Sequence, residues 1–249
     1  MSRNELYLDL MKRVLTNVIY RDAPLGPRAS VGNTYVHDIR IAGKDWPSVA
    51  HTMVGLKRLD NLQECVEQVL IDGVPGDFIE TGVWRGGSCI FMRAILKAHN
   101  VQDRTVWVAD SFAGMPHADE DWYPGDQSMA IDHFNDVLSV SIEQVKENFR
   151  RYDLLDDQVE FLQGWFADTL PTASVKELAV LRLDGDLYES TMTTLTHLYP
   201  KLSVGGYIIV DDYELPICQA AIHDYRGQQG IEEDIVPIDD YGVYWRRMD

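Results

Sequence analysis

The sequence predicts an α/β fold whose sheet is mostly parallel, with an antiparallel C-terminal strand and an N-terminal helical cap. From residue 77 onward, short apolar runs alternate with helical patterns, as in parallel strands joined by crossover helices. Four of these runs end in acids, which are Glu80, Asp110, Asp184 and the pair Asp211 and Asp212. If the four strands are neighbours, these carboxylates meet at the carboxyl edge of the sheet, where open α/β folds bind their ligands.

Length, charge and cysteine content set the class of protein. The chain has 249 residues, enough for one large α/β domain with a modest cap. Its 40 acidic and 22 basic residues give a formal charge of −18, which opposes binding to nucleic acid and to anionic membranes. No window approaches the ~18 apolar residues of a membrane span, no secretory signal is visible, and the three cysteines form no CxxC pair. We therefore expect a cytoplasmic protein with reduced core thiols and with no nucleic-acid or membrane partner.

Residues 1–72 are expected to form N-terminal helices and a lid segment. Apolar residues at helical spacing predict helices over 4–20 and 52–71. Between them, residues 21–50 are rich in proline and glycine and lack periodicity. This composition favours an irregular segment that lies over another part of the fold.

Residues 73–249 are expected to hold the sheet. The predicted strands occupy 77–80, 105–109, 159–163, 177–183 and 206–210, followed by an antiparallel pair at 234–238 and 242–247. The predicted helices occupy 88–100, 141–155, 190–199 and 215–228. The irregular stretch between Ser111 and Ser141 is too long for an ordinary turn from strand to helix, so we expect it to overhang the ligand edge. A plain surface insertion is the alternative.

The first predicted strand runs into a glycine-containing turn and the start of a helix. Gly82, Gly86 and Gly87 allow a tight turn and a close approach to a ligand, and Ser88 is a suitable helix cap. The spacing differs from the GxGxxG fingerprint that binds a dinucleotide pyrophosphate. An acid at this strand end, Glu80, suits a ligand with an ammonium group. S-adenosylmethionine offers one, together with a sulfonium and a ribose.

Two further positions suit the other parts of such a ligand. Asp110 ends the next strand, where a carboxylate can accept hydrogen bonds from two ribose hydroxyls. Gly164 and Trp165 follow the third strand, where a bare backbone and an aromatic plane can hold a flat heterocycle such as adenine. The alternatives are a solvent-facing or helix-capping Asp110 and a core position for Trp165.

The strongest signal is the combination of Asp184-Gly185-Asp186 with Asp211-Asp212. Carboxylates forced together repel and raise one another's pKa, so a site that gathers three of them needs a cation or a proton. Ligation by oxygen alone, without a nearby histidine or cysteine, favours Mg²⁺, Mn²⁺ or Ca²⁺ over zinc. The alternative is that Asp186 and Asp212 cap the following helices, which we expect for Asp186.

At these same residues the chain resembles the macrocin O-methyltransferase family, Mg²⁺-dependent enzymes that methylate sugar hydroxyls of glycosylated bacterial natural products. The resemblance covers almost the whole length and includes the segments 74–77, 80–87, 104–112, 152–157, 164–166, 184–186 and 210–213. It implies the Rossmann-like sheet of class I methyltransferases, an S-adenosylmethionine-binding domain over 73–249 and a homo-oligomer. The loops at 21–45 and 113–140 match less well, so the acceptor stays open.

The resemblance also assigns roles to residues. It implies Mg²⁺ bound by Asp184, Asp211 and Asp212, with Asp184 as the catalytic base. It implies S-adenosylmethionine bound through the ETG turn, the ADS strand end and the GW pair, which are Glu80, Thr81, Gly82, Asp110, Ser111, Gly164 and Trp165. The expected reaction transfers a methyl group to a deoxysugar hydroxyl of a glycosylated small-molecule acceptor, as in antibiotic tailoring.

Three other functions stay open from the sequence. A catechol-type methyltransferase uses similar metal chemistry on phenols. A nicotinamide-dependent oxidoreductase shares the βαβ layout, but its glycine spacing and a catalytic Tyr/Lys pair are missing. A non-catalytic α/β module that binds a divalent cation would explain the acids but not the glycine turn or the aromatic residue after the third strand.

Overall fold

The centre of the computed structural model is a seven-stranded sheet in the order β5-β4-β3-β6-β7-β9-β8. The structure describes residues 2–25, 34–119 and 122–249. The parallel strands are β3 (Asp77–Thr81), β4 (Val106–Asp110), β5 (Val159–Gln163), β6 (Leu178–Leu183) and β7 (Leu202–Val210). The antiparallel edge is formed by β9 (Val243–Arg246) and β8 (Val236–Pro237). The predicted mostly parallel sheet with an antiparallel C-terminal edge is confirmed.

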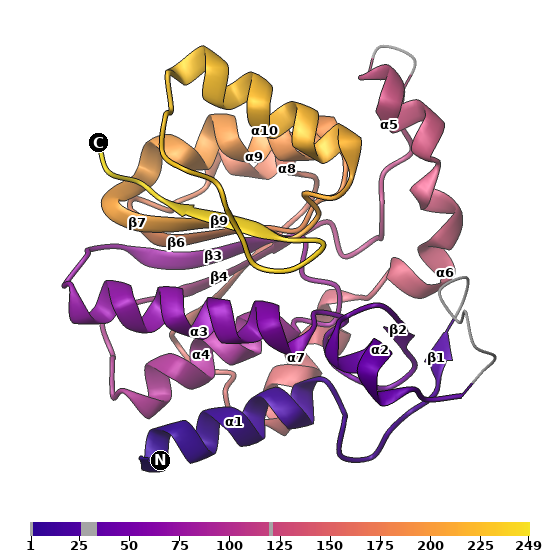
Figure 1. Ribbon diagram of the computed structural model, residues 1–249, viewed down its shortest axis with the longest axis vertical. Coiled ribbons are helices and arrows are strands. Elements are labelled where there is room, and N and C mark those ends of the chain that lie inside the picture. The colour runs from indigo at the N-terminus through magenta and orange to yellow at the C-terminus, as the bar shows by residue number, and fades with distance from the viewer. Residues whose placement is uncertain (1, 26–33, 120–121) are drawn as a thin grey trace.

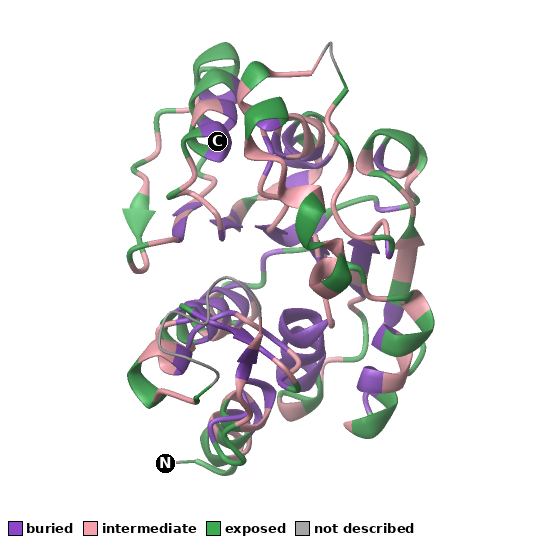
Figure 2. Ribbon diagram, turned by 90° about the vertical axis from the view of Figure 1, so that its right-hand side faces the viewer, coloured by how far each residue is buried: buried purple, intermediate pink, exposed green. Residues whose placement is uncertain are grey.

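Helices cover both faces of this sheet (Figure 1). One face carries α1 (Arg3–Leu15), α3 (Leu56–Ile71), α4 (Gly87–Ala98) and α7 (Ile142–Arg151). The opposite face carries α8 (Phe166–Thr169), α9 (Tyr188–Leu198) and α10 (Pro216–Gln229). Buried residues concentrate in the sheet and on the helix sides turned toward it (Figure 2). Because helices shield it on both faces, the central strand β6 is buried at every position.

Two helix ends differ from the prediction for local reasons. The first helix ends at Leu15 rather than near residue 20, because the Thr16 hydroxyl donates to the Lys12 carbonyl at 2.8 Å and Asn17 takes a left-handed backbone with φ 52°. The cap of α4 is Gly86, with φ 85°, so the prediction that Ser88 caps this helix is wrong. A left-handed cap favours glycine, and Ser88 lies buried inside the first turn.

The described part of the segment 21–50 is more ordered than predicted. It contains β1 (Pro24–Leu25), α2 (His37–Ile41) and β2 (Trp46–Pro47), while residues 26–33 of the expected lid lie outside the described residues. The buried guanidinium of Arg40 donates to Asp45 at 2.8 Å and to Asp22 at 2.6 Å. These ion pairs join sequence positions without periodicity, so hydropathy patterns did not show them.

The long stretch after β4 also folds into short helices, namely α5 (Pro124–Met129), a 3₁₀ turn (Ile131–Phe134) and α6 (Asn135–Leu138). Its buried Asp126 accepts the backbone N–H groups of Tyr188 at 2.8 Å and Glu189 at 3.0 Å, which caps α9. The expectation that Asp186 caps this helix is therefore wrong. Asp186 precedes the cap residue Leu187, with its own N–H directed to Asp212 at 3.2 Å.

The remaining class features agree with the sequence. Cys65, Cys89 and Cys218 are free and buried. Among the described residues, no helix combines the length and apolar character that crossing a bilayer requires. Apolar residues of α1 and α3 share one core cluster with the sheet residue Phe78. The N-terminal helices are thus packed directly against the sheet-bearing part of the chain.

Candidate functional site

Strand register brings three of the predicted acids to one level of the sheet. Ala109, Thr81, Leu183 and Val210 are aligned across four neighbouring strands. The residues that follow them are Asp110, Gly82, Asp184 and Asp211. Asp110, Asp184 and Asp211 therefore meet at the carboxyl edge, on either side of the point where the strand order reverses, as the sequence predicted. Glu80 lies two residues deeper, within β3 and opposite Arg182.

Three of these acids form a compact group, which we call the acid cluster: Asp184, Asp211 and Asp212. One carboxylate oxygen from each lies within 4.8 Å of the others. Burial raises the pKa of Asp212 well above its ordinary value, and the neighbouring charges of Asp186 and Asp184 raise it further. Burial and the charge of Asp211 also raise the pKa of Asp184, against the lowering effect of Arg182. The acid cluster thus resists carrying its full negative charge without a counter-ion.

The main counter-charge is Arg182, which the sequence pattern did not distinguish from its apolar neighbours. This arginine is 1% exposed, and its Nη1 donates to Asp184 Oδ2 at 2.6 Å and to Glu80, while Nη2 donates to Asp211. Arg182 and Asp184 are two residues apart at the end of one strand, so their side chains share a face of the sheet. That spacing is the sequence signal that could have identified this arginine.

A second buried arginine reaches the acid cluster from α3. Arg58 Nη1 donates to Asp211 Oδ2, and Arg58 Nε forms an ion pair of 3.3 Å with Asp239 in the turn before β9. Nothing in the helical pattern of residues 52–71 distinguished this arginine from a surface charge. Only the packing of α3 over β6 and β7 brings it to Asp211.

Glu80 and Thr81 lie beneath the glycine turn rather than in a cavity wall. Glu80 is directly opposite Arg182 in the strand register, is 2% exposed, and accepts a hydrogen bond from the Cys89 thiol at 2.8 Å. Burial raises the pKa of Glu80 to about 7, although Arg182 opposes the shift. The Thr81 hydroxyl donates to the Arg182 carbonyl at 3.5 Å. Both residues therefore contact Arg182.

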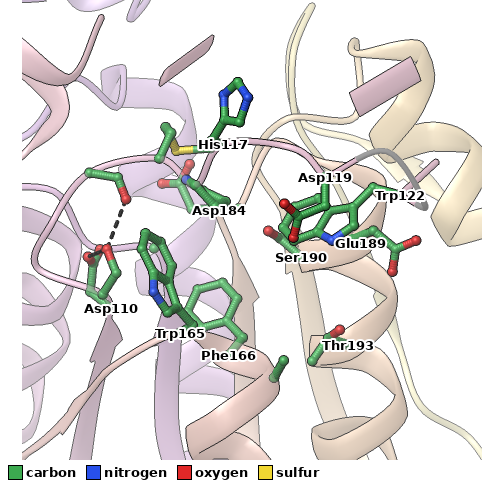
Figure 3. A pocket seen from close by; sticks show the side chains of 17 residues that line it. Asp110, His117, Asp119, Trp122, Trp165, Phe166, Asp184, Glu189, Ser190 and Thr193 are labelled. Atoms are coloured by element: carbon green, nitrogen blue, oxygen red, sulfur yellow. Dashed lines mark hydrogen bonds between the residues drawn. The ribbon is translucent and has the colours of Figure 1, made fainter. Parts of the chain in front are cut away.

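A cavity of about 400 Å³ lies over the ends of β4 and β6 (Figure 3). Its floor includes Gly82, Asp110, Ser111 and Asp184, and the loop after β4 covers it with Met115, His117 and Trp122. Trp165 and Phe166 lie beside each other in its wall, with Trp165 41% exposed. The described structure therefore places Trp165 at a cavity and excludes the alternative of a core position.

Hydrogen bonds from the glycine turn after β3 and from the loop after β4 hold the Asp110 carboxylate in place. Its Oδ2 accepts the Val83 N–H at 2.8 Å, and its Oδ1 accepts the Phe112 N–H at 2.7 Å and the Ser111 hydroxyl at 3.4 Å. Burial nevertheless raises the pKa of Asp110. Each carboxylate oxygen can accept more than one hydrogen bond, so Asp110 can also receive a donor from a bound ligand.

Gly82 and Gly164 both adopt backbone conformations with positive φ, which favour glycine. Gly82 has φ 88°, and a Cβ there would overlap the carbonyl oxygen of Asp184. Gly164 has φ 141°, and its N–H donates to the Asp110 carbonyl at 2.9 Å. Gly82 lines the cavity, whereas Gly164 does not; its neighbour Trp165 does.

A second cavity of about 140 Å³ lies over the acid cluster. Its walls are mostly apolar and come from both irregular segments and the glycine turn, including Trp46, Met53, Trp84, Met115, Met129, Ile131 and Leu138. It shares Gly82, Asp110, Gly114, Met115 and Asp184 with the larger cavity. The two cavities therefore meet above Asp184, and the loop after β4 overhangs them as expected.

This strand order, with a glycine turn and acids at its switch point, defines the Rossmann-like fold of class I methyltransferases. The TylF macrocin-O-methyltransferase family matches residues 4–247, and the chain belongs to this family. The resemblance inferred from the motifs is thus confirmed.

Named relatives extend this finding. The chain is 60% identical over 248 residues to the 8-demethyl-8-(2,3-dimethoxy-alpha-L-rhamnosyl)-tetracenomycin-C 4'-O-methyltransferase of Streptomyces olivaceus, covering 97% of this chain and 92% of the relative. It is 57% identical over 245 residues to the mycinamicin III 3''-O-methyltransferase of Micromonospora griseorubida, covering 98% and 96%. The solved structure of the O-methyltransferase NovP superposes with a TM-score of 0.94 at 57% identity, covering 99% of this chain and all of that one.

Proposed function

We propose that this methyltransferase transfers the methyl group of S-adenosylmethionine to a sugar hydroxyl of a glycosylated natural product, with a divalent cation at the acid cluster. The relatives from Streptomyces olivaceus and Micromonospora griseorubida are named for O-methylation of a rhamnosyl tetracenomycin and of mycinamicin III. High identity over nearly the whole chain supports a similar acceptor class here.

The observation that carries the proposal is the junction of two cavities above Asp184. Methyl transfer requires a donor and an acceptor held in contact, and this positioning alone supplies a large part of the rate. The larger cavity suits the cofactor and the smaller one suits the sugar. The smaller cavity lies below the ~300–1,000 Å³ of most ligand pockets, so it would take one ring while the rest of the acceptor extends outward.

The cofactor roles follow from the residues of the larger cavity. Asp110 would accept hydrogen bonds from the ribose, with Ser111 beside it, and Trp165 would stack on adenine. Gly82 would allow close approach of the methionine portion to the turn. We assign Glu80 and Thr81 a supporting role through Arg182 and Gly164 a role in orienting Trp165, because these three do not line the cavity.

The acid cluster fits Mg²⁺ or Mn²⁺ by its donor chemistry. It offers three carboxylates, and the two buried guanidinium groups beside it are also paired with Glu80 and Asp239, so the acids outnumber the arginines and leave an excess of negative charge. A divalent cation held by Asp184, Asp211 and Asp212 would offset this excess and lower the pKa of a bound sugar hydroxyl.

Within this arrangement Asp184 is the proposed base. It lines both cavities, and Arg182 holds its Oδ2, which leaves Oδ1 to accept the hydroxyl proton.

Calorimetric titration with S-adenosylhomocysteine, with and without Mg²⁺, tests the cofactor site. Tight binding that weakens in Asp110→Ala supports it, whereas no heat and no competition by S-adenosylmethionine would refute it. A screen of deoxysugar glycosides and catechols then tests the acceptor class, and turnover of catechols alone would favour the phenolic alternative. Replacing Asp184 by Ala should abolish turnover, and near-native kcat would remove it as the base.

A further inference from the structure

Arg58 occupies an unusual position for a helix residue of an acidic protein. It is 6% exposed, and its guanidinium contacts three separate parts of the chain: Asp211 after β7, Asp239 before β9 and the Gly43 carbonyl at 3.4 Å. The Tyr241 ring lies beneath it, with the guanidinium carbon 5.3 Å from the ring centroid. The N-terminal segment, α3 and the C-terminal turn thus converge on one side chain.

Two glycines make room for this side chain. A Cβ at Gly43, which has φ 65°, would overlap Arg58 Nη2. A Cβ at Gly242 would come within 3.2 Å of Arg58 Cδ, closer than ordinary contact. The backbone therefore closes around Arg58 from both ends of the chain, and this close fit restricts where its guanidinium can lie.

The consequence falls on Asp211. Its Oδ2 accepts from Arg58 and its Oδ1 accepts from Arg182, so guanidinium groups fix both oxygens of this carboxylate. An ionised carboxylate has about four lone-pair sites, so each oxygen can still bind a cation. We propose that Arg58 is a positioning residue that, together with Arg182, orients Asp211 for capture of a divalent cation. This inference rests on the cation site of the proposed function.

The sign of the effect separates this role from simple electrostatics. A positive charge beside Asp211 repels an incoming cation, so removing Arg58 would tighten cation binding if charge alone mattered. If Arg58 orients Asp211, its removal releases the carboxylate and weakens binding. Loss of the group that orients a metal ligand typically costs about 10–100-fold in metal affinity.

Binding of Mn²⁺ to the full chain, followed by the electron paramagnetic resonance signal of free Mn²⁺, distinguishes the two cases. We expect the dissociation constant of Arg58→Met to rise about 10–100-fold. Arg58→Lys, which keeps the charge but carries its donors on a single nitrogen, should recover part of that loss. Arg93→Met is the matched control, because Arg93 is also buried and donates to Asp156 at 2.9 Å, away from the acid cluster. It should bind Mn²⁺ like the wild type.

A milder variant covers the case in which Arg58→Met does not fold. Arg58→Lys keeps the positive charge, so charge alone predicts unchanged Mn²⁺ binding in this variant. If the guanidinium contacts orient Asp211, their loss should weaken Mn²⁺ binding, by a smaller factor than in Arg58→Met. Unchanged or tighter binding in the folded Arg58 variants would overturn the positioning role of Arg58 and leave the cation site in place. Absence of Mn²⁺ binding to the wild type would overturn the cation site, and this inference with it.

Discussion

Replacing Gly82 by Ala tests whether the glycine turn and the acid cluster are packed as one unit. The backbone at Gly82 is left-handed, with φ 88°, and a Cβ there overlaps the carbonyl oxygen of Asp184 on the adjacent strand. The conformation costs roughly 1–2 kcal/mol for a residue with a side chain. The overlap adds about 1–3 kcal/mol, because the strand ends of β3 and β6 must separate. We therefore expect a total loss of roughly 2–5 kcal/mol in the free energy of unfolding.

Gly73→Ala is the matched control for that experiment. Gly73 is also left-handed, with φ 65°, but no atom lies within 4 Å of its added Cβ, so this variant isolates the conformational cost. Urea unfolding of both variants should give a difference of about 1–3 kcal/mol, and Gly82→Ala alone should weaken S-adenosylhomocysteine binding. Equal unfolding free energies within about 0.5 kcal/mol, with equal ligand affinity, would refute the reasoning.

Three further predictions concern other parts of the molecule. Burial, with smaller effects of Arg151 and Arg85, lowers the pKa of His51 to about 4. The unfolded chain, in which this pKa is about 6.5, therefore takes up the proton first as the pH falls. Up to about 3 kcal/mol of the free energy of unfolding is lost between pH 6.5 and pH 4. His51→Gln should flatten this slope in urea unfolding between pH 7 and 4, and an unchanged slope argues against it. Asp126→Ala removes the cap of α9 and should lower the free energy of unfolding by about 0.5–2 kcal/mol, a loss that thermal denaturation should detect. Trp165→Ala should weaken S-adenosylhomocysteine binding by about 1–3 kcal/mol in calorimetry, whereas Trp165→Phe should keep most of the binding free energy. Equal affinities of the wild type and Trp165→Ala would refute the proposed stacking of Trp165 on adenine.

Local sequence determined the strands and most of the candidate site. Apolar runs ending in acids are visible one strand at a time, and parallel strands place all such ends at one edge, so the sequence pattern alone was enough to group Asp110, Asp184 and Asp211. The family motifs lie in the same turns and strand ends. Short segments of the sequence are therefore enough to predict the fold class, the family and the neighbouring positions of these residues.

Tertiary structure decided which groups counterbalance those acids. Arg182 faces Glu80 only because of the register between β3 and β6, and Arg58 reaches Asp211 only because α3 packs over β6 and β7. Asp126 caps a helix 62 residues further along the chain, a pairing that no local pattern contains. Buried charges must find partners wherever the packing places them, so these contacts depend on the whole fold rather than on any one segment.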